Sequence, residues 1–169
     1  NNRITMAFFE TIYSWFHNFY NDVMWDTVRE IISDNDEQLF ADSLYVVGIV
    51  TLVVSLLIAV AFYIWPINNP SFKSWKSWIV MLLISMLLNF GVGVGMGYSR
   101  VLSVSDDEEA CALILGDDYD GQALTDETGI NNYLGFGLSN LFIGSIFFMV
   151  CCIPLTFYNG NAKFSPFRK

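Results

Sequence analysis

The sequence predicts an all-α integral membrane protein with three transmembrane helices and an N-terminal amphipathic helix on the outer face. Three observations favour this class: the composition, three long uncharged runs, and the separation of charge between the segments that join them. Of the 169 residues, 54% are hydrophobic and 15% are charged, whereas soluble domains carry about 25% charged residues. A water-soluble enzyme is therefore a poor interpretation of this chain.

Residues 1–43 combine an amphipathic pattern with a polar linker. Over residues 4–32, one face carries apolar side chains at helical spacing: Ile4, Phe8, Ile12, Trp15, Phe16, Phe19 and Val23. The other face carries Glu10, Ser14, His17, Asn18 and Asn21. This spacing predicts one amphipathic helix, which either lies flat in the membrane interface or packs on the outer ends of the spanning helices. Because its polar face is acidic rather than basic, we favour contact with protein over a free lipid anchor.

Three uncharged runs cover residues 44–65, 77–99 and 133–158. At a rise of about 1.5 Å per residue, the first run alone spans about 33 Å, enough to cross the hydrocarbon core of a bilayer. Aromatic residues mark the ends of each run, as is typical at the level of the lipid headgroups. They are Tyr45, Tyr63, Trp65, Trp75, Trp78, Tyr98, Tyr133 and Tyr158. We therefore expect three transmembrane helices.

The connecting segments differ in charge. The loop 66–76 and the tail 159–169 contain five basic and no acidic residues, whereas residues 1–43 and the loop 100–132 contain all seventeen acidic residues and three arginines. Because Lys and Arg near helix ends favour the cytoplasmic side, we expect an extracytoplasmic N-terminus and a cytoplasmic C-terminus. A bacterial inner membrane is the favoured location and an organelle membrane is the alternative. The net charge of −9 also argues against nucleic acid as a partner.

Four glycines alternate through the outer half of the second run: Gly91, Gly93, Gly95 and Gly97. They form two overlapping GxxxG spacings, which allow helix backbones to approach closely. The third run offers small residues as packing partners, namely Gly135, Ser139 and Gly144. The alternating glycines also resemble the filter strand of potassium channels, and this resemblance implies an unwound, pore-lining segment as the alternative to close helix packing.

Asn89 and Asn140 are the strongest polar groups inside the runs. We expect them to form hydrogen bonds across helices, worth on the order of 1 kcal/mol each; the alternative is a polar lining for a substrate path. None of the three runs contains Asp, Glu, Lys, Arg or His. Proton-coupled carriers and pumps require such groups within the membrane, so the sequence argues against that class.

Candidates for catalysis or metal binding are few. His17 is the only histidine, and Glu10 lies two helical turns away without a third group to complete a site, so we interpret His17 as a surface residue. The three cysteines show no zinc-binding spacing. We therefore predict no enzyme activity, no catalytic residue, no cofactor and no structural metal.

The acidic loop contains a partial match to the EF-hand calcium loop. Asp118, Asp120, Gly121 and Glu127 fall at four positions of that pattern, whereas Gly116 occupies the position that requires Asp. A solvated acidic loop is the favoured interpretation, and weak calcium binding is the alternative.

A bundle of three helices with small-residue faces and a wide apolar exterior is poorly suited to act alone. The leading hypothesis is a structural or accessory subunit of a larger membrane complex, with other membrane protein subunits and the lipid bilayer as partners, and with a hetero-complex favoured over a homo-oligomer. The alternative is a homo-oligomeric cation channel or pore, in which the acidic outer face concentrates cations at the mouth.

Overall fold

The computed structural model describes residues 2–32, 38–63, 75–116 and 124–158. Their elements follow in the order α1 (Asn2–Ser14), η1 (His17–Phe19), α2 (Asp22–Val28), β1 (Ile31–Ile32), β2 (Gln38–Phe40), α3 (Ser43–Tyr63), α4 (Trp75–Ser105), α5 (Glu108–Leu115) and α6 (Leu124–Tyr158). The two short strands pair antiparallel. The fold is mostly helical, as the sequence predicts.

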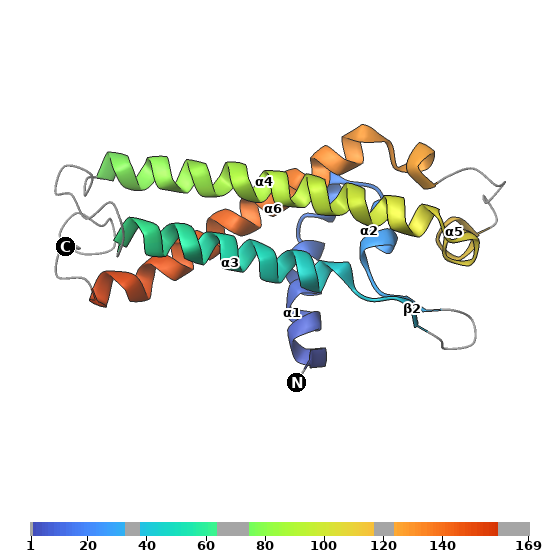
Figure 1. Ribbon diagram of the computed structural model, residues 1–169, viewed down its shortest axis with the longest axis horizontal. Helices are drawn as coiled ribbons and strands as arrows, with labels where there is room; N and C mark the ends of the chain where they lie inside the picture. The colour runs from blue at the N-terminus through green and yellow to red at the C-terminus, as the bar shows by residue number, and fades with distance from the viewer. Residues whose placement is uncertain (1, 33–37, 64–74, 117–123, 159–169) are drawn as a thin grey trace.

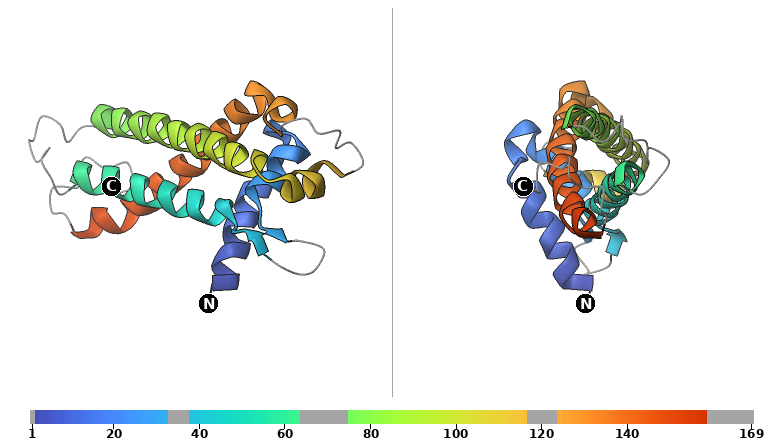
Figure 2. Two further views of the ribbon diagram at one scale, coloured as in Figure 1. Left: turned by 45° about the vertical axis from the view of Figure 1, so that its right-hand side comes forward. Right: turned by 90° about the vertical axis from the view of Figure 1, so that its left-hand side faces the viewer.

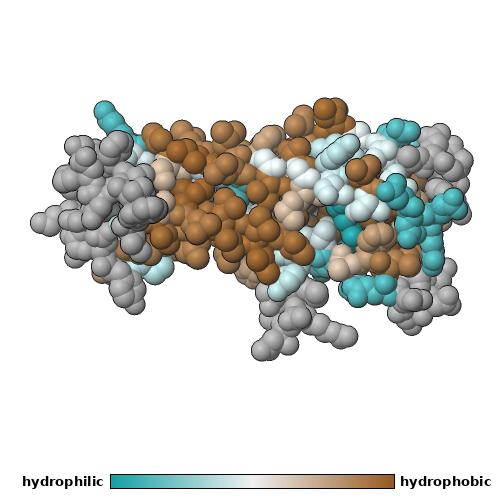
Figure 3. All heavy atoms as spheres, viewed as in Figure 1, coloured by the Kyte–Doolittle hydropathy of each residue, from teal (hydrophilic) through white to brown (hydrophobic). Residues whose placement is uncertain are grey.

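Three helices, α3, α4 and α6, are long and apolar enough to cross a membrane. They run along the long axis of the molecule and pack against one another, with α6 in contact with both α3 and α4 (Figure 1). Apolar residues cover much of the visible surface of this bundle (Figure 3). The three-helix prediction is confirmed to this extent, and the arrangement fits a membrane-embedded protein.

Two of the long helices extend beyond the predicted runs. Helix α4 continues from Arg100 to Ser105, and α6 already begins at Leu124. Between them lies α5, so the described parts of the segment 100–132, residues 100–116 and 124–132, are largely helical. Charge marks where a helix leaves an apolar environment, but it does not end the helix itself. Within α6 the helical path breaks at Gly129, whose φ of 58° favours glycine.

The prediction of one continuous helix over residues 4–32 is wrong. Helix α1 ends at Ser14, and after the turn η1 a separate helix α2 begins at Asp22. The Oδ1 atom of Asn21 accepts a hydrogen bond of 2.9 Å from the Met24 amide, so Asn21 is the N-cap of α2. The apolar spacing places Asn21 on the polar face of a longer helix, although Asn is also a common N-cap residue.

Helix α1 lies across the bundle rather than along it, against α3 and α6 (Figures 1 and 2). Phe9 and Tyr13 are its buried side chains, whereas Phe8 and Trp15 are exposed. The predicted apolar stripe meets the bundle in part, because Ile12 and Phe16 are half-buried against its core. The most deeply buried contacts come from Phe9 and Tyr13, each one position away from the stripe.

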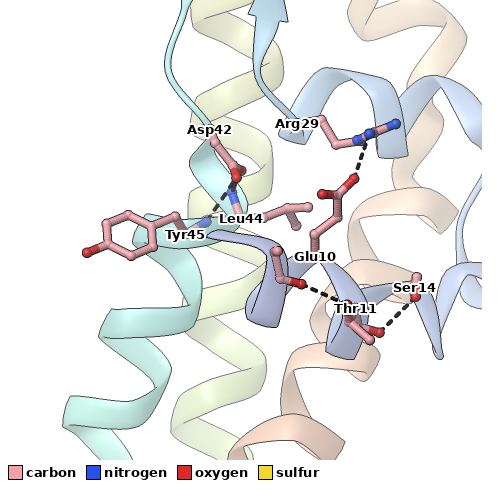
Figure 4. A network of polar contacts seen from close by, with 8 residues as sticks. Glu10, Thr11, Ser14, Arg29, Asp42, Leu44 and Tyr45 are labelled. Atoms are coloured by element: carbon pink, nitrogen blue, oxygen red, sulfur yellow. Dashed lines mark hydrogen bonds and ion pairs between the residues drawn. The ribbon is translucent and has the colours of Figure 1, made fainter. Parts of the chain in front are cut away.

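The aspartate that precedes α3 fixes the start of this helix. The Oδ1 atom of Asp42 accepts hydrogen bonds from the backbone amides of Leu44 (2.9 Å) and Tyr45 (3.4 Å) (Figure 4). These amides have no partner within the helix, so Asp42 serves as the N-cap. Burial raises the pKa of this carboxyl group, which means that ionisation of Asp42 costs the folded state more than the unfolded chain.

Replacement of Asp42 tests the cap. We expect Asp42→Ala to lower the free energy of unfolding by about 1 kcal/mol, because two amides lose their acceptor. The matched variant Asp42→Asn keeps an acceptor and removes the charge that burial disfavours, so it should retain at least the wild-type value at neutral pH. Thermal or denaturant unfolding in detergent measures both variants. An equal loss in the two variants would contradict the capping role.

Candidate functional site: a buried polar cluster

A cluster of uncharged polar side chains lies in the middle of the bundle. Its members come from all three long helices and are fully buried, with relative exposures of 0%: Thr51, Ser55, Ser85, Asn89, Ser139 and Asn140. On α3 they lie between the buried apolar residues Val47 and Ile58, which belong to two separate apolar clusters. The polar cluster therefore forms a layer between two apolar parts of the core.

Asn140 connects four helices. Its Oδ1 atom accepts a hydrogen bond from the Tyr13 hydroxyl of α1 and lies 2.9 Å from the Thr51 hydroxyl of α3. Its Nδ2 atom donates to the backbone carbonyl of Asn89 on α4, at 2.6 Å. Tyr13 was missed as a member of this site, because the sequence places it outside the uncharged runs. Burial raises the pKa of Tyr13 above its ordinary value.

Asn89 connects α4 to α3 and lies against α6. Its Nδ2 atom donates to the Ser55 hydroxyl (3.0 Å) and to the Ser85 carbonyl (2.9 Å). Ser55 in turn donates to the Gly144 carbonyl at 3.1 Å. A Cβ atom at Gly144 would lie only 2.4 Å from Asn89 Nδ2, so glycine is what allows the amide to fit here. The Asn89 Oδ1 atom is buried and has no hydrogen-bond partner within the described part of the chain.

The four glycines of α4 divide into two pairs on different faces. Gly93 and Gly97 are buried: a Cβ atom at Gly93 would lie 2.7 Å from Asn140 Cβ, and one at Gly97 would lie 2.7 Å from Met24 Cε. At Gly91 and Gly95, by contrast, an added Cβ atom would meet nothing within 4 Å. The helix is regular throughout this segment and does not unwind as in the pore-lining alternative.

The small residues of α6 have different neighbours. An added Cβ atom at Gly135 would lie 1.8 Å from the Phe19 carbonyl oxygen, so Gly135 faces the segment between α1 and α2 rather than α4. The Ser139 hydroxyl donates to the Gly135 carbonyl at 3.0 Å. Gly137 lies against α4, where an added Cβ atom would be 2.4 Å from Val94 Cγ2. No sequence pattern indicated this contact.

Charged residues gather at the end of the bundle that α2 covers. Arg29 Nη2 lies 2.6 Å from Glu10 Oε1 (Figure 4), and Arg100 Nε donates to the Thr27 carbonyl at 2.9 Å. His17 Nε2 lies 3.2 Å from Asp22 Oδ1, so His17 and Glu10 are not brought together. The Arg100 contact holds α2 on α4, and the ion pair of Arg29 with Glu10 joins α1 to the residue that follows α2.

The chemistry available to the polar cluster is limited to hydrogen bonding by amides and hydroxyls. Within the described ranges the cluster contains no acidic or basic side chain and no nucleophile paired with a base. Of the partial calcium loop, Asp118, Asp120 and Gly121 lie outside the described residues, so calcium binding there stays a prediction.

Comparisons with protein families, with curated proteins and with solved structures found no match to this chain. Its function must therefore be inferred from its own residues.

The hydrogen bond between Tyr13 and Asn140 can be tested by a double-mutant cycle. We expect Tyr13→Phe to lower the free energy of unfolding by about 1 kcal/mol, because the ring stays in place while the hydroxyl is lost. Asn140→Ala should cost more, on the order of 2–3 kcal/mol, because several buried groups lose their partner at once. The double variant should lose less than the sum of the two single losses.

Tyr98→Phe serves as the control for this cycle, because Tyr98 is 51% exposed and its hydroxyl is not part of the cluster. Its unfolding free energy should match that of the wild type. Strictly additive losses for Tyr13→Phe and Asn140→Ala would show that the two side chains are not coupled.

Proposed function

We propose that this chain is a structural or accessory subunit of a larger membrane complex and that α4 is its docking helix. The observation that carries this proposal is the second glycine pair, Gly91 and Gly95, which faces outward, so that an added Cβ atom would meet nothing within 4 Å. The inner pair already serves the bundle, so the outer pair has no packing role within the described chain.

The outer glycine pair lies on an apolar face. Leu87 and Leu88 precede it with exposures of 70% and 50%, and Tyr98 follows it at 51%. Between these larger side chains the surface falls to the level of the helix backbone. Lipid chains fill such a depression poorly, whereas a second helix can approach it closely and gain dispersion contacts.

Glycine in a helix also has a cost, which supports a role for this pair. Each glycine inside a helix is about 1 kcal/mol less favourable than alanine in water. Alanine would meet no steric obstacle at Gly91 or Gly95. Bundle stability therefore gives no reason for these two glycines, whereas close approach of another transmembrane helix does.

The alternative, a homo-oligomeric cation channel, receives less support. The polar side chains that could line a pore are fully buried and form hydrogen bonds within one bundle. They are Thr51, Ser55, Asn89 and Asn140. The exposed hydroxyl of Ser145 donates to the carbonyl of Phe142 in its own helix, at 2.7 Å. A ring of copies would thus line its centre mainly with apolar side chains.

For the orientation, we propose that the N-terminal region and α5 lie on the extracytoplasmic side, and that the bacterial inner membrane is the favoured location. The support is the bias of Lys and Arg toward the loop 66–76 and the tail 159–169. Hydrophilic residues are frequent at the end of the bundle that carries α5, as expected of a part that lies outside the membrane (Figure 3).

Filling the outer depression tests the proposed docking. We expect the wild-type chain, extracted in a mild detergent, to be recovered with other membrane protein subunits that mass spectrometry identifies. Replacing both Gly91 and Gly95 with Leu should abolish this recovery while the bundle stays folded, because neither position touches its interior. The control is Val53→Leu with Val150→Leu, which adds bulk at two other exposed sites. A monomer without partners, or partners retained by the glycine variant, would refute the proposal.

Flux measurements address the channel alternative. We expect liposomes that contain the purified chain to show no cation flux in either orientation of the protein. A flux that weakens when the acidic run 106–109 is replaced by its amides would instead favour the channel, since these carboxylates lie on the outer face in that hypothesis.

A further inference from the structure

We propose that α1 is an interfacial helix whose exposed aromatic face inserts into the lipid leaflet on the side of the N-terminal region. The partner is the boundary between the acyl chains and the headgroups. The inserted side chains are Phe8 on α1, Trp15 directly after α1, and Phe19 at the end of η1. They are exposed by 52%, 68% and 43%. The proposal is independent of the docking role of α4.

The first argument is the direction of α1. The three helices that can span a membrane run along one axis, and α1 crosses this axis (Figures 1 and 2). A helix in this position lies in the plane of a membrane that the bundle spans. Phe9 anchors it there: an added Cβ atom at Gly48 would lie 2.2 Å from its ring, so only glycine on α3 admits the contact.

The second argument is the depth of α1 along the bundle. Phe9 packs on Tyr45 and Gly48, within the first two turns of α3. In Figure 3 the apolar surface of the bundle extends to about the level of α1, and hydrophilic residues become frequent beyond it. Helix α1 therefore lies where the apolar surface ends.

The third argument is the rotation of α1 about its own axis. At about 100° per residue, Phe8 and Glu10 project about 160° apart, on nearly opposite sides of α1. Glu10 pairs with Arg29, on the side where α2 and Asp42 lie (Figure 4). The exposed Phe8 therefore points away from α2 and Asp42, along the apolar length of the bundle, while the buried Phe9 and Tyr13 hold α1 on α3 and α6.

The fourth argument is the continuity of the aromatic face with the exterior of α6. The ring of Phe142 stacks on Phe16 and Phe19, with centroid distances of 5.9 and 6.1 Å. Phe142 is itself exposed by 38%, and Val150 continues the exposed apolar surface along α6 at 56%. A membrane that covers this surface of α6 reaches Phe19 and the adjoining face of α1.

The polar atoms near this face are compatible with lipid. The Thr11 hydroxyl donates to the Ala7 carbonyl, and the Ser14 hydroxyl donates to the Thr11 carbonyl, both at 2.7 Å (Figure 4). Hydroxyl groups in apolar surroundings satisfy their hydrogen in this manner. Aromatic side chains of this kind favour the level of the lipid headgroups.

Spin labels on α1 test this arrangement in phosphatidylcholine vesicles. Nitroxides are placed singly at residues 8 and 15 through Phe8→Cys and Trp15→Cys, in a background with Cys111, Cys151 and Cys152 replaced by Ala. We expect collisions with dissolved O2 to exceed those with a water-soluble nickel chelate at both positions. The control is Ile32→Cys, at an exposed site on β1, where the ratio should be reversed. Dominant nickel accessibility at residues 8 and 15 would overturn the proposal.

Photo-crosslinking provides a second measurement that keeps the native cysteines. Benzoylphenylalanine replaces Phe8 or Trp15, so that one aromatic side chain substitutes for another, and native membranes are irradiated. We expect phospholipid adducts at both positions, and none when the probe replaces Ile32. Adducts to another protein, or to a second copy of the chain, would show that protein rather than lipid covers this face and would overturn the proposal.

Discussion

The structure depends on one requirement: polar groups inside an apolar bundle must find partners within the protein. The side-chain amide of Asn140 meets this requirement for several elements at once, because Tyr13, Thr51 and the Asn89 carbonyl all converge on it. Hydrogen bonds have direction, unlike apolar contacts, so they fix the rotation of α6 relative to α3 and α4. They also explain why α1 is held at one place on the bundle, since Tyr13 is both its buried anchor and a donor to Asn140.

Some of this fold could be predicted from the sequence, because hydrocarbon imposes a simple rule of length and charge. The three uncharged runs gave the three long helices, with errors only at their ends, such as the extension of α4 to Ser105. The break between α1 and α2 was missed because the apolar spacing continues through it, although Asn21 caps a new helix there. Pattern alone could not show that Phe9 and Tyr13 face the bundle, since the face used depends on where α1 crosses it.

The sequence predicts that buried amides form the candidate site, but it does not predict all of their partners. Asn89 and Asn140 stand out because amides are rare at membrane depth, whereas Tyr13 looks like one more aromatic residue of an amphipathic helix. The sequence also presents the two GxxxG spacings as equivalent. They differ only once the rotation of α4 is known, and this rotation is set by partners distant in sequence, including Asn140 and Met24.

The division of the glycines gives α4 one face that packs within the bundle and one exposed apolar face, which is the proposed docking face. Residues two positions apart project about 200° apart on a helix, so Gly91 and Gly93 lie on nearly opposite sides. The inner face is fixed by the Asn89 and Asn140 amides, which leaves the outer face in one defined rotation. If α1 lies in the interface as proposed, it also fixes the depth and tilt of the bundle in the membrane. The polar cluster and the aromatic helix would then act together to present Gly91 and Gly95 to a neighbouring helix at one height and in one direction, as the proposed docking requires.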